Sequence, residues 1–175
     1  YRYGIFDAVA EWLQDIKRDL PPFLSVIKNG VWIERAILEY QTERFNLPFE
    51  DQQVAVRLQR PIQEQAAAAR LLLLSFASDS AHSLTVAPYR LVADCFLAAG
   101  HLALSFDLPN HGTQVNSYGE GITGMRNAQV AGANPLDAFV RQGMAVIDSC
   151  LDQGLARPGY IAVCGTSRGG YMALT

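Results

Sequence analysis

The chain opens with a helical pattern of apolar positions. Large apolar side chains recur at three- and four-residue intervals over residues 5–20, which predicts an amphipathic helix with a solvated charged face. Pro21 and Pro22 end it, because proline cannot continue the hydrogen-bond ladder. We therefore expect residues 1–35 to form a helical leader and residues 36–175 to form the main domain.

Two stretches then alternate apolar and polar residues. Residues 36–44 alternate first, and residues 53–59 follow after a loop that contains Pro48. Two strands of period two, close in sequence, predict an antiparallel pair at the outside of a sheet with one face in solvent. The expected inward faces are Leu38, Tyr40 and Thr42 in the first strand, and Val54, Val56 and Leu58 in the second.

Further along, short apolar runs alternate with helical patterns. The runs at 71–76, 102–106 and 160–164 have the composition of strands covered on both faces. Helices are expected from Pro88 to Gly100 and from Pro135 to Gly154. The expected buried stripes are Leu91, Val92, Cys95, Phe96 and Ala99 in the first helix, and Leu136, Phe139, Val140, Gly143, Ile147, Cys150 and Leu151 in the second. This order predicts an α/β fold, a mostly parallel sheet with helices on both faces.

Two connections complete this pattern. Residues 77–85 are predicted to be a polar loop. Residues 108–134 form a long glycine-rich connection that leaves the carboxyl end of a strand. Long connections inside a domain are usually functional, so this one either covers a substrate site or is an ordered surface loop.

Composition and charge narrow the function classes. The chain has 175 residues, a net charge of −3, 50% hydrophobic residues and 18% charged residues, which gives no reason to expect a nucleic-acid or anionic-membrane partner. There is no apolar run long enough for a membrane span. The three cysteines, Cys95, Cys150 and Cys164, fall in apolar patterns and are expected to be buried reduced thiols, which favours a cytoplasmic location.

The clearest candidate chemistry lies near the end of the chain. Gly165-Thr166-Ser167-Arg168-Gly169-Gly170 follows a predicted strand and precedes a predicted helix. This is the context of a nucleophile elbow, in which a sharp turn exposes the Ser167 hydroxyl and the following N–H, that of Arg168, donates to an oxyanion. A dinucleotide site is excluded here, because G-x-G-x-x-G is not present. The alternative is a glycine-rich turn with a surface serine.

Together these residues resemble the α/β-hydrolase superfamily over residues 36–175. The resemblance rests on the elbow, on Phe106-Asp107-Leu108-Pro109-Asn110-His111-Gly112, which looks like a D-x-P-x-H-G segment, and on Arg157-Pro158-Gly159-Tyr160-Ile161 before the elbow strand. The doubled glycine and the leader helix are most similar to the branch of prolyl-oligopeptidase-type peptidases and dienelactone-hydrolase-like esterases.

The resemblance implies a serine hydrolase that forms an acyl-enzyme on Ser167 and acts on a small ester or amide. It implies a second oxyanion donor from the backbone of Ala77 or Ser78, and no metal or organic cofactor. Carboxylic-ester hydrolysis is the expected activity, since no propeller repeats precede the domain. A prolyl-oligopeptidase-type peptidase and a non-catalytic fragment or pseudoenzyme remain alternatives.

The catalytic acid and base do not follow the family order within this sequence. The order is Ser, then Asp or Glu, then His, yet all three histidines precede Ser167. His101 begins a strand and is expected to be structural, whereas His82 and His111 fall on loops that could line the site. We expect the sequence to be the part of a longer hydrolase that ends after the elbow. Alone, it would expose an apolar sheet edge through which it could self-associate.

Overall fold

The computed structural model describes residues 39–62 and 70–175, and residues 39–175 form one compact unit. The predicted leader helix lies outside the described residues. The strands are β1 (Tyr40–Phe49), β2 (Gln52–Pro61), β3 (Leu72–Phe76), β4 (Leu102–Phe106) and β5 (Ile161–Gly165). The helices are α2 (Ser80–Thr85), α3 (Leu91–Ala98), α4 (Gly121–Val130), α5 (Pro135–Asp152) and α6 (Arg168–Ala173), with a short 3₁₀ helix, η2 (Gly112–Gln114).

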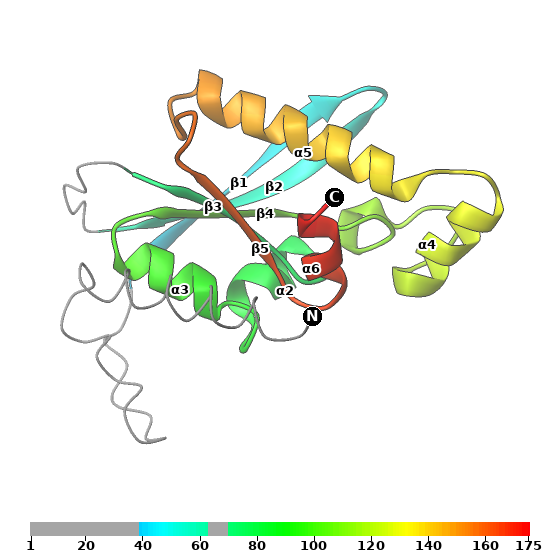
Figure 1. Cartoon of the computed structure of the whole chain (residues 1–175), viewed down its shortest axis with the longest axis horizontal. Coiled ribbons are helices and arrows are strands. Elements are labelled where there is room, and N and C mark those ends of the chain that lie inside the picture. The colour runs from blue at the N-terminus through cyan, green and yellow to red at the C-terminus, as the bar shows by residue number, and fades with distance from the viewer. Residues whose placement is uncertain (1–38, 63–69) are drawn as a thin grey trace, which may run out of the picture. The chain divides into compact units, whose positions relative to one another are not determined.

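The five strands form one mixed sheet in the order β1-β2-β4-β3-β5. β1 and β2 are antiparallel to their neighbours, while β4, β3 and β5 run parallel. α5 covers one face, and α2 and α3 cover the other (Figure 1). The predicted α/β architecture is therefore confirmed, with its antiparallel pair at one side of the sheet and the elbow strand β5 at the opposite edge.

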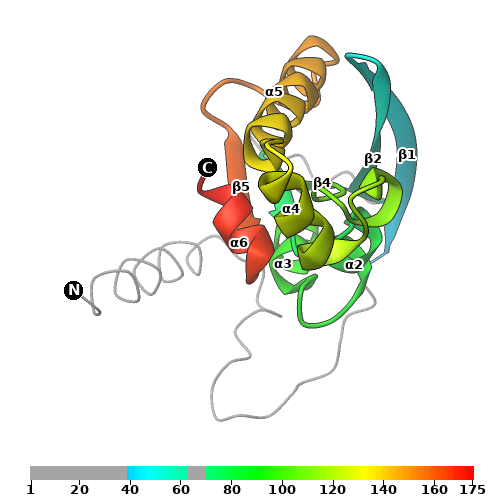
Figure 2. The ribbon, with the colours of Figure 1, turned by 90° about the vertical axis from the view of Figure 1, so that its right-hand side faces the viewer.

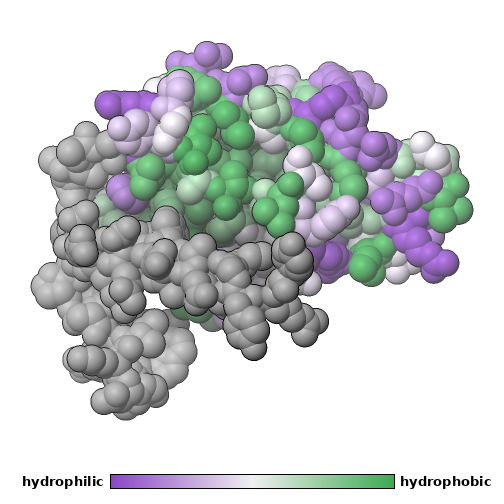
Figure 3. Space-filling model, viewed as in Figure 1, coloured by the Kyte–Doolittle hydropathy of each residue, from purple (hydrophilic) through white to green (hydrophobic). Residues whose placement is uncertain are grey.

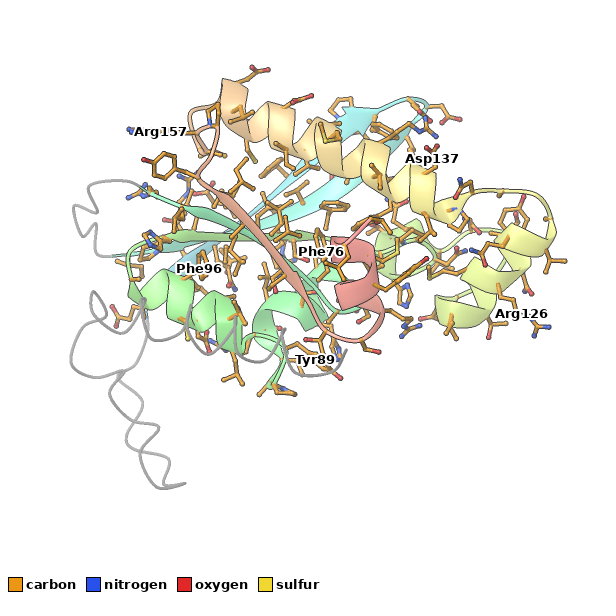
Figure 4. The ribbon with its side chains drawn as sticks, in the orientation of Figure 1. Phe76, Tyr89, Phe96, Arg126, Asp137 and Arg157 are labelled. Atoms are coloured by element: carbon orange, nitrogen blue, oxygen red, sulfur yellow. The ribbon has the colours of Figure 1, made fainter. Side chains whose placement is uncertain are left out.

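The core beneath α5 is built around three phenylalanines. Phe76 at the end of β3 lies edge-on to Phe106 and Phe139, with ring centroids 5.0 and 5.1 Å away. Figure 4 shows Phe76 at the centre of the sheet, beside α6. The same strand end also contacts the elbow, so the packing of this core fixes the position of the candidate site.

The outer strands differ from the prediction in phase and length. β1 continues through Pro48 to Phe49, and its core-facing apolar residues are Phe45, Leu47 and Phe49 rather than Tyr40 and Thr42. The predicted Leu38 lies outside the described residues. Proline is tolerated because β1 is an edge strand, where one row of N–H groups needs no partner. In β2 the predicted apolar face is buried, but Gln59 on the other face is buried too, and its Nε2 donates to the carbonyl oxygen of Leu84 at 3.4 Å. The α2 segment thus covers part of the predicted solvent face.

Both predicted loops contain helices. Residues 80–85 form α2, whose N-cap Asp79 accepts a hydrogen bond from the backbone N–H of His82 at 2.8 Å. Residues 121–130 form α4 within the glycine-rich connection. Glycine lowers helix propensity, so the local sequence pattern did not predict α4.

The buried faces of α3 and α5 also differ from the prediction. In α3, which begins at Leu91 rather than Pro88, the buried residues are Ala93, Phe96 and Leu97, whereas Leu91 and Val92 are exposed. In α5 the predicted Phe139 and Cys150 are buried, together with Gln142 and Val146, which the prediction missed. The other predicted α5 positions are partly buried. Packing against a twisted sheet, rather than apolar spacing alone, decides which stripe turns inward.

The three thiols have different surroundings. Cys150 is buried and Cys164 is half-buried, but Cys95 is exposed, contrary to the prediction. Burial raises the pKa of the Cys150 thiol to about 11, because a thiolate is poorly solvated inside a protein. Among the described residues, no helix is both long and apolar enough to cross a membrane.

Hydrophobic side chains are exposed along the β5 edge and on α6 (Figure 3). Val163 of β5 is 46% exposed and Tyr171 of α6 is 60% exposed. β5 pairs with β3, and it has no other neighbour among the described strands. Self-association through this edge stays a prediction.

Candidate active site

Ser167 occupies the strained turn that the sequence predicts. It lies between β5 and α6 with φ 56° and ψ −118°, a combination that L-residues rarely adopt and that costs of order 1–3 kcal/mol. Its side chain is exposed. Such strain persists only where the surroundings over-determine the backbone, and here glycines on both sides do so.

Gly165 and Gly169 are required by close backbone contacts. A Cβ on Gly165 would overlap the backbone of Gly169, and a Cβ on Gly169 would overlap the backbone of Phe76. The backbone N–H of Thr166 donates to the carbonyl oxygen of Phe76 at 2.9 Å. The elbow is therefore held against the end of β3 by both sterics and a hydrogen bond.

The backbone N–H of Arg168 is available as an oxyanion donor. Arg168 is the first residue of α6, where the helix supplies no acceptor for the N–H. No other described residue accepts from this N–H. An N–H at the start of a helix also lies at the positive end of the helix dipole. This matches the role expected for the residue after the serine.

The backbone N–H of Ala77 is already used, which argues against it as the second donor. It donates to Oγ of Ser83 at 2.9 Å, and that hydroxyl donates to the carbonyl oxygen of Asp79 at 2.7 Å. The N–H of Ser78 has no acceptor in the described part of the chain. Of the two candidates from the sequence, Ser78 is the one left free.

The aspartate of the D-x-P-x-H-G segment holds the loops together rather than facing Ser167. Asp107 is 4% exposed. Its Oδ1 accepts from the backbone N–H of Ser80 at 2.7 Å, and its Oδ2 accepts from the N–H and Oγ1 of Thr113 at 2.7 and 2.8 Å. The carboxylate thus ties the start of α2 to η2. A Cβ on Gly112 would overlap it.

The three histidines have other contacts, and none hydrogen-bonds Ser167. His111 is 7% exposed, with Nδ1 2.8 Å from the carbonyl oxygen of Pro109. The ring of His82 lies against Tyr89 with centroids 4.8 Å apart. Nδ1 of His101 accepts from the N–H of Leu71 at 3.4 Å, and burial lowers its pKa. His101 is thus structural, as predicted, and the local bond of His111 orders its loop.

The segment after β4 lies beside the elbow. Asn110 has φ 61°, and its Nδ2 donates to Oδ1 of Asn116 at 2.9 Å and to the carbonyl oxygen of Gly119 at 3.0 Å. An ideal Cβ on Gly121, the first residue of α4, would lie 3.8 Å from both Nη1 of Arg168 and Nε2 of His111. α4 and α6 accordingly lie at the same end of the molecule (Figure 2).

An open cleft of about 400 Å³ lies between the β1–β2 pair and the loops that contain Asp79 and Asp107. Ser167 does not line it. We place the candidate chemistry at the elbow, because backbone strain and a free N–H occur there. In the described ranges, no group of three or more His, Cys, Asp or Glu side chains could hold a metal ion.

The sequence did not predict the contacts that order the loops around the candidate site. The sequence places three of the residues involved in predicted loops: Asp79, Asp107 and Thr113. Asp79 is in fact the N-cap of α2. An aspartate before Ser-Ala-His-Ser is an N-cap signal that could have predicted α2. The Asp107–Thr113 contact left no comparable signal.

Solved structures give the fold a broader context. No protein-family model and no curated protein matches the sequence. A cold-adapted esterase from an Arctic intertidal metagenomic library is similar with a TM-score of 0.58 and 23% identity, over 81% of this chain and 56% of that one. A Bacteroides fragilis protein identified by name as an acetyl xylan esterase is similar with a TM-score of 0.55 and 16% identity, over 77% of this chain and 40% of that one. The chain therefore spans about half the length of these structures.

The observed features agree with these likenesses. The strand order, the parallel crossovers and the strained Ser167 between β5 and α6 are all parts of one architecture. They show that this chain has the α/β-hydrolase fold.

Proposed function

We propose that the protein containing this chain is a serine hydrolase that cleaves carboxylic esters through an acyl-enzyme on Ser167. The observation that carries the proposal is the backbone of Ser167, whose φ of 56° and ψ of −118° are maintained between two glycines that no larger residue could replace. A serine with only a structural role gives no reason to maintain such strain.

The proposed reaction uses groups around the elbow. Oγ of Ser167 attacks the ester carbonyl and loses its proton to a base, and the carbonyl oxygen becomes an oxyanion. The N–H groups of Arg168 and Ser78 donate to that oxygen, and each such donor is typically worth about 10²–10³ in rate. Collapse expels the alcohol, and water then releases the acid. None of the described histidines contacts Ser167, so the proposal assigns the base and its acid to no described residue. In the chain order of the fold both follow the serine.

Ester hydrolysis is favoured over peptide hydrolysis by the structural likenesses. Both structures named above are called esterases, and they carry a TM-score above 0.5. The identities of 23% and 16% describe the fold alone, so the substrate stays part of the proposal.

The test is made on the complete protein that contains this chain. A fluorophosphonate probe should label Ser167, and Ser167→Ala should abolish labelling and lower kcat on a simple ester by roughly 10⁴- to 10⁶-fold. Ser149→Ala is the matched control, since Ser149 is a half-buried residue of α5 whose Oγ accepts a hydrogen bond from Nε2 of Gln153. It should behave as wild type. Full ester hydrolysis by Ser167→Ala would refute the proposal and leave the elbow as a structural turn.

A further inference from the structure

Three groups from different parts of the chain converge beside Ser167. They are the guanidinium of Arg168, the Nε2 atom of His111 and the first turn of α4. The space in front of Gly121 is common to them, because an ideal Cβ there would lie 3.8 Å from Nη1 of Arg168 and 3.8 Å from Nε2 of His111. The absence of a side chain at Gly121 leaves this space open.

Arg168 brings a charge that no acidic side chain neutralises. The ion pairs between described residues involve Arg60, Arg90 and Arg141, and no carboxylate in the described ranges pairs with Arg168. A guanidinium presents a planar set of donors that matches a carboxylate. Arg168 directly follows Ser167, so a ligand bound to it would lie within reach of the reacting ester.

The start of α4 adds backbone donors. The N–H of Gly121 donates to the carbonyl oxygen of Asn110, but those of Ile122 and Thr123 have no acceptor among the described residues. The preceding residue, Glu120, makes no capping hydrogen bond with its side chain. Free N–H groups and the helix dipole together favour an anion at this end of the ten-residue helix.

His111 supplies the independent sign that a ligand belongs here. Its ring is 7% exposed, and Nε2 is buried with no hydrogen-bond partner. The contact between Nδ1 and the carbonyl oxygen of Pro109 places a proton on Nδ1, which leaves Nε2 facing the space at Gly121 as an unpaired polar atom. Buried polar atoms normally have partners, and an anionic oxygen would accept a hydrogen bond from Nε2 in the imidazolium form of the ring, in which both nitrogens are donors.

We propose that Arg168, Nε2 of His111 and the N–H groups of Ile122 and Thr123 form a carboxylate-binding subsite that selects esters carrying a second, negatively charged group. This inference rests on the proposed esterase function and names its substrate class. Glu120, which directly precedes α4, has an exposed carboxylate whose charge opposes that of the ligand.

The catalytic test compares two esters of nearly equal shape in the complete protein. Monomethyl succinate carries a carboxylate, and methyl levulinate replaces it with a neutral ketone. Arg168→Gln, which keeps the backbone N–H, should lower the ratio of kcat/KM for monomethyl succinate to kcat/KM for methyl levulinate by about 10- to 30-fold. His111→Phe keeps the ring volume but removes Nε2, and it should lower the same preference by a smaller factor.

Arg126→Gln is the matched control. Arg126 is an exposed residue of α4 that points away from the body of the sheet (Figure 4), and its replacement should leave both rates unchanged. Equal losses on the two esters in Arg168→Gln, or no charge preference in the wild type, would overturn the subsite. An unchanged preference in a folded His111→Phe protein would overturn the assignment of Nε2.

A binding test separates this inference from the esterase proposal. In the complete Ser167→Ala protein, titration with succinate should shift the amide NMR signals of residues 121–123, and Arg168→Gln should remove these shifts. Shifts without fluorophosphonate labelling of Ser167 would keep the subsite and refute the esterase. Labelling of Ser167 without these NMR shifts would keep the esterase proposal and refute the subsite.

Discussion

The elbow at residues 165–170 and the rim at residues 107–124 are both rich in glycine, but they differ in the contacts that hold them in place. At the elbow, Gly165 and Gly169 are needed because backbones meet too closely for any Cβ. On the rim, a Cβ on Gly112 would overlap the Asp107 carboxylate and one on Gly124 would overlap the backbone of Gly119, whereas Gly121 has only ordinary contacts around it. Buried hydrogen bonds also hold these loops. The elbow is fixed mainly by close backbone contacts, whereas the rim combines such contacts with buried side-chain hydrogen bonds.

This difference explains why one region could be read from sequence more easily than the other. Steric demands between neighbours along the chain recur as a spacing of residue types, such as G-x-S-x-G. Hydrogen bonds such as that from the N–H of Ser80 to Asp107 depend on where two segments meet in space. Three predictions sharpen the comparison, from the largest expected effect to the smallest.

Gly169→Ala tests the steric description of the elbow. The added Cβ would overlap the backbone of Phe76, which cannot move without disturbing β3, so we expect a loss of at least about 3 kcal/mol in the free energy of unfolding. Gly143→Ala is the control. Gly143 lies in α5, and an added Cβ would make an ordinary contact with the Phe106 ring, at 3.7 Å. This substitution should change stability by no more than about 1 kcal/mol, in the stabilising direction. Urea unfolding measures both, and equal effects would refute the steric description.

Asp107→Asn tests the hydrogen bonds of the rim. The amide cannot accept all the hydrogen bonds that the two carboxylate oxygens accept, so buried N–H groups would lose their partners. We expect a loss of about 2–3 kcal/mol in the free energy of unfolding. Asp148→Asn, at an exposed position of α5, should stay within about 0.5 kcal/mol of wild type. If the two variants unfold at the same urea concentration, Asp107 does not hold the rim.

The pair Asn110→Ala and Asn110→Gly separates backbone strain from hydrogen bonding. Both lose the bonds to Asn116 and Gly119, but only alanine also strains the backbone at φ 61°. We expect Asn110→Ala to cost about 1–2 kcal/mol, and Asn110→Gly to be more stable than it by about 0.5–1 kcal/mol. Thermal unfolding gives the difference. A glycine variant no more stable than the alanine variant would show that the hydrogen bonds alone matter.

Much of the fold could be predicted because the burial of side chains requires a periodic pattern of apolar residues in the sequence. The apolar runs of β3, β4 and β5 and the caps at Asn134 and Gly154 gave the parallel units and their order. The phase of β1 could not be predicted, because an edge strand exposes much of both faces and its alternation is weak. Gln59 looked like a surface residue, since its cover by Leu84 comes from a segment far along the chain.

At the candidate site, the sequence predicts Ser167 as the nucleophile and the N–H of Arg168 as an oxyanion donor, and it leaves Ala77 and Ser78 undecided. The choice depends on Ser83, whose hydroxyl takes the N–H of Ala77 once α2 has formed. Nδ1 of His111 contacts the carbonyl oxygen of Pro109 within its own loop. That its other nitrogen faces Arg168 across Gly121 follows only from the position of α4.

The sequence by itself determined the α/β order and the elbow, because both arise from burial and steric constraints between residues close along the chain. The tertiary structure decided which backbone donors stay free, that a glycine-rich connection forms α4, and which polar groups gather around Gly121. Those outcomes depend on contacts between segments distant in sequence. No local pattern records such contacts, because many residue pairs could form them and only the packed sheet selects among them.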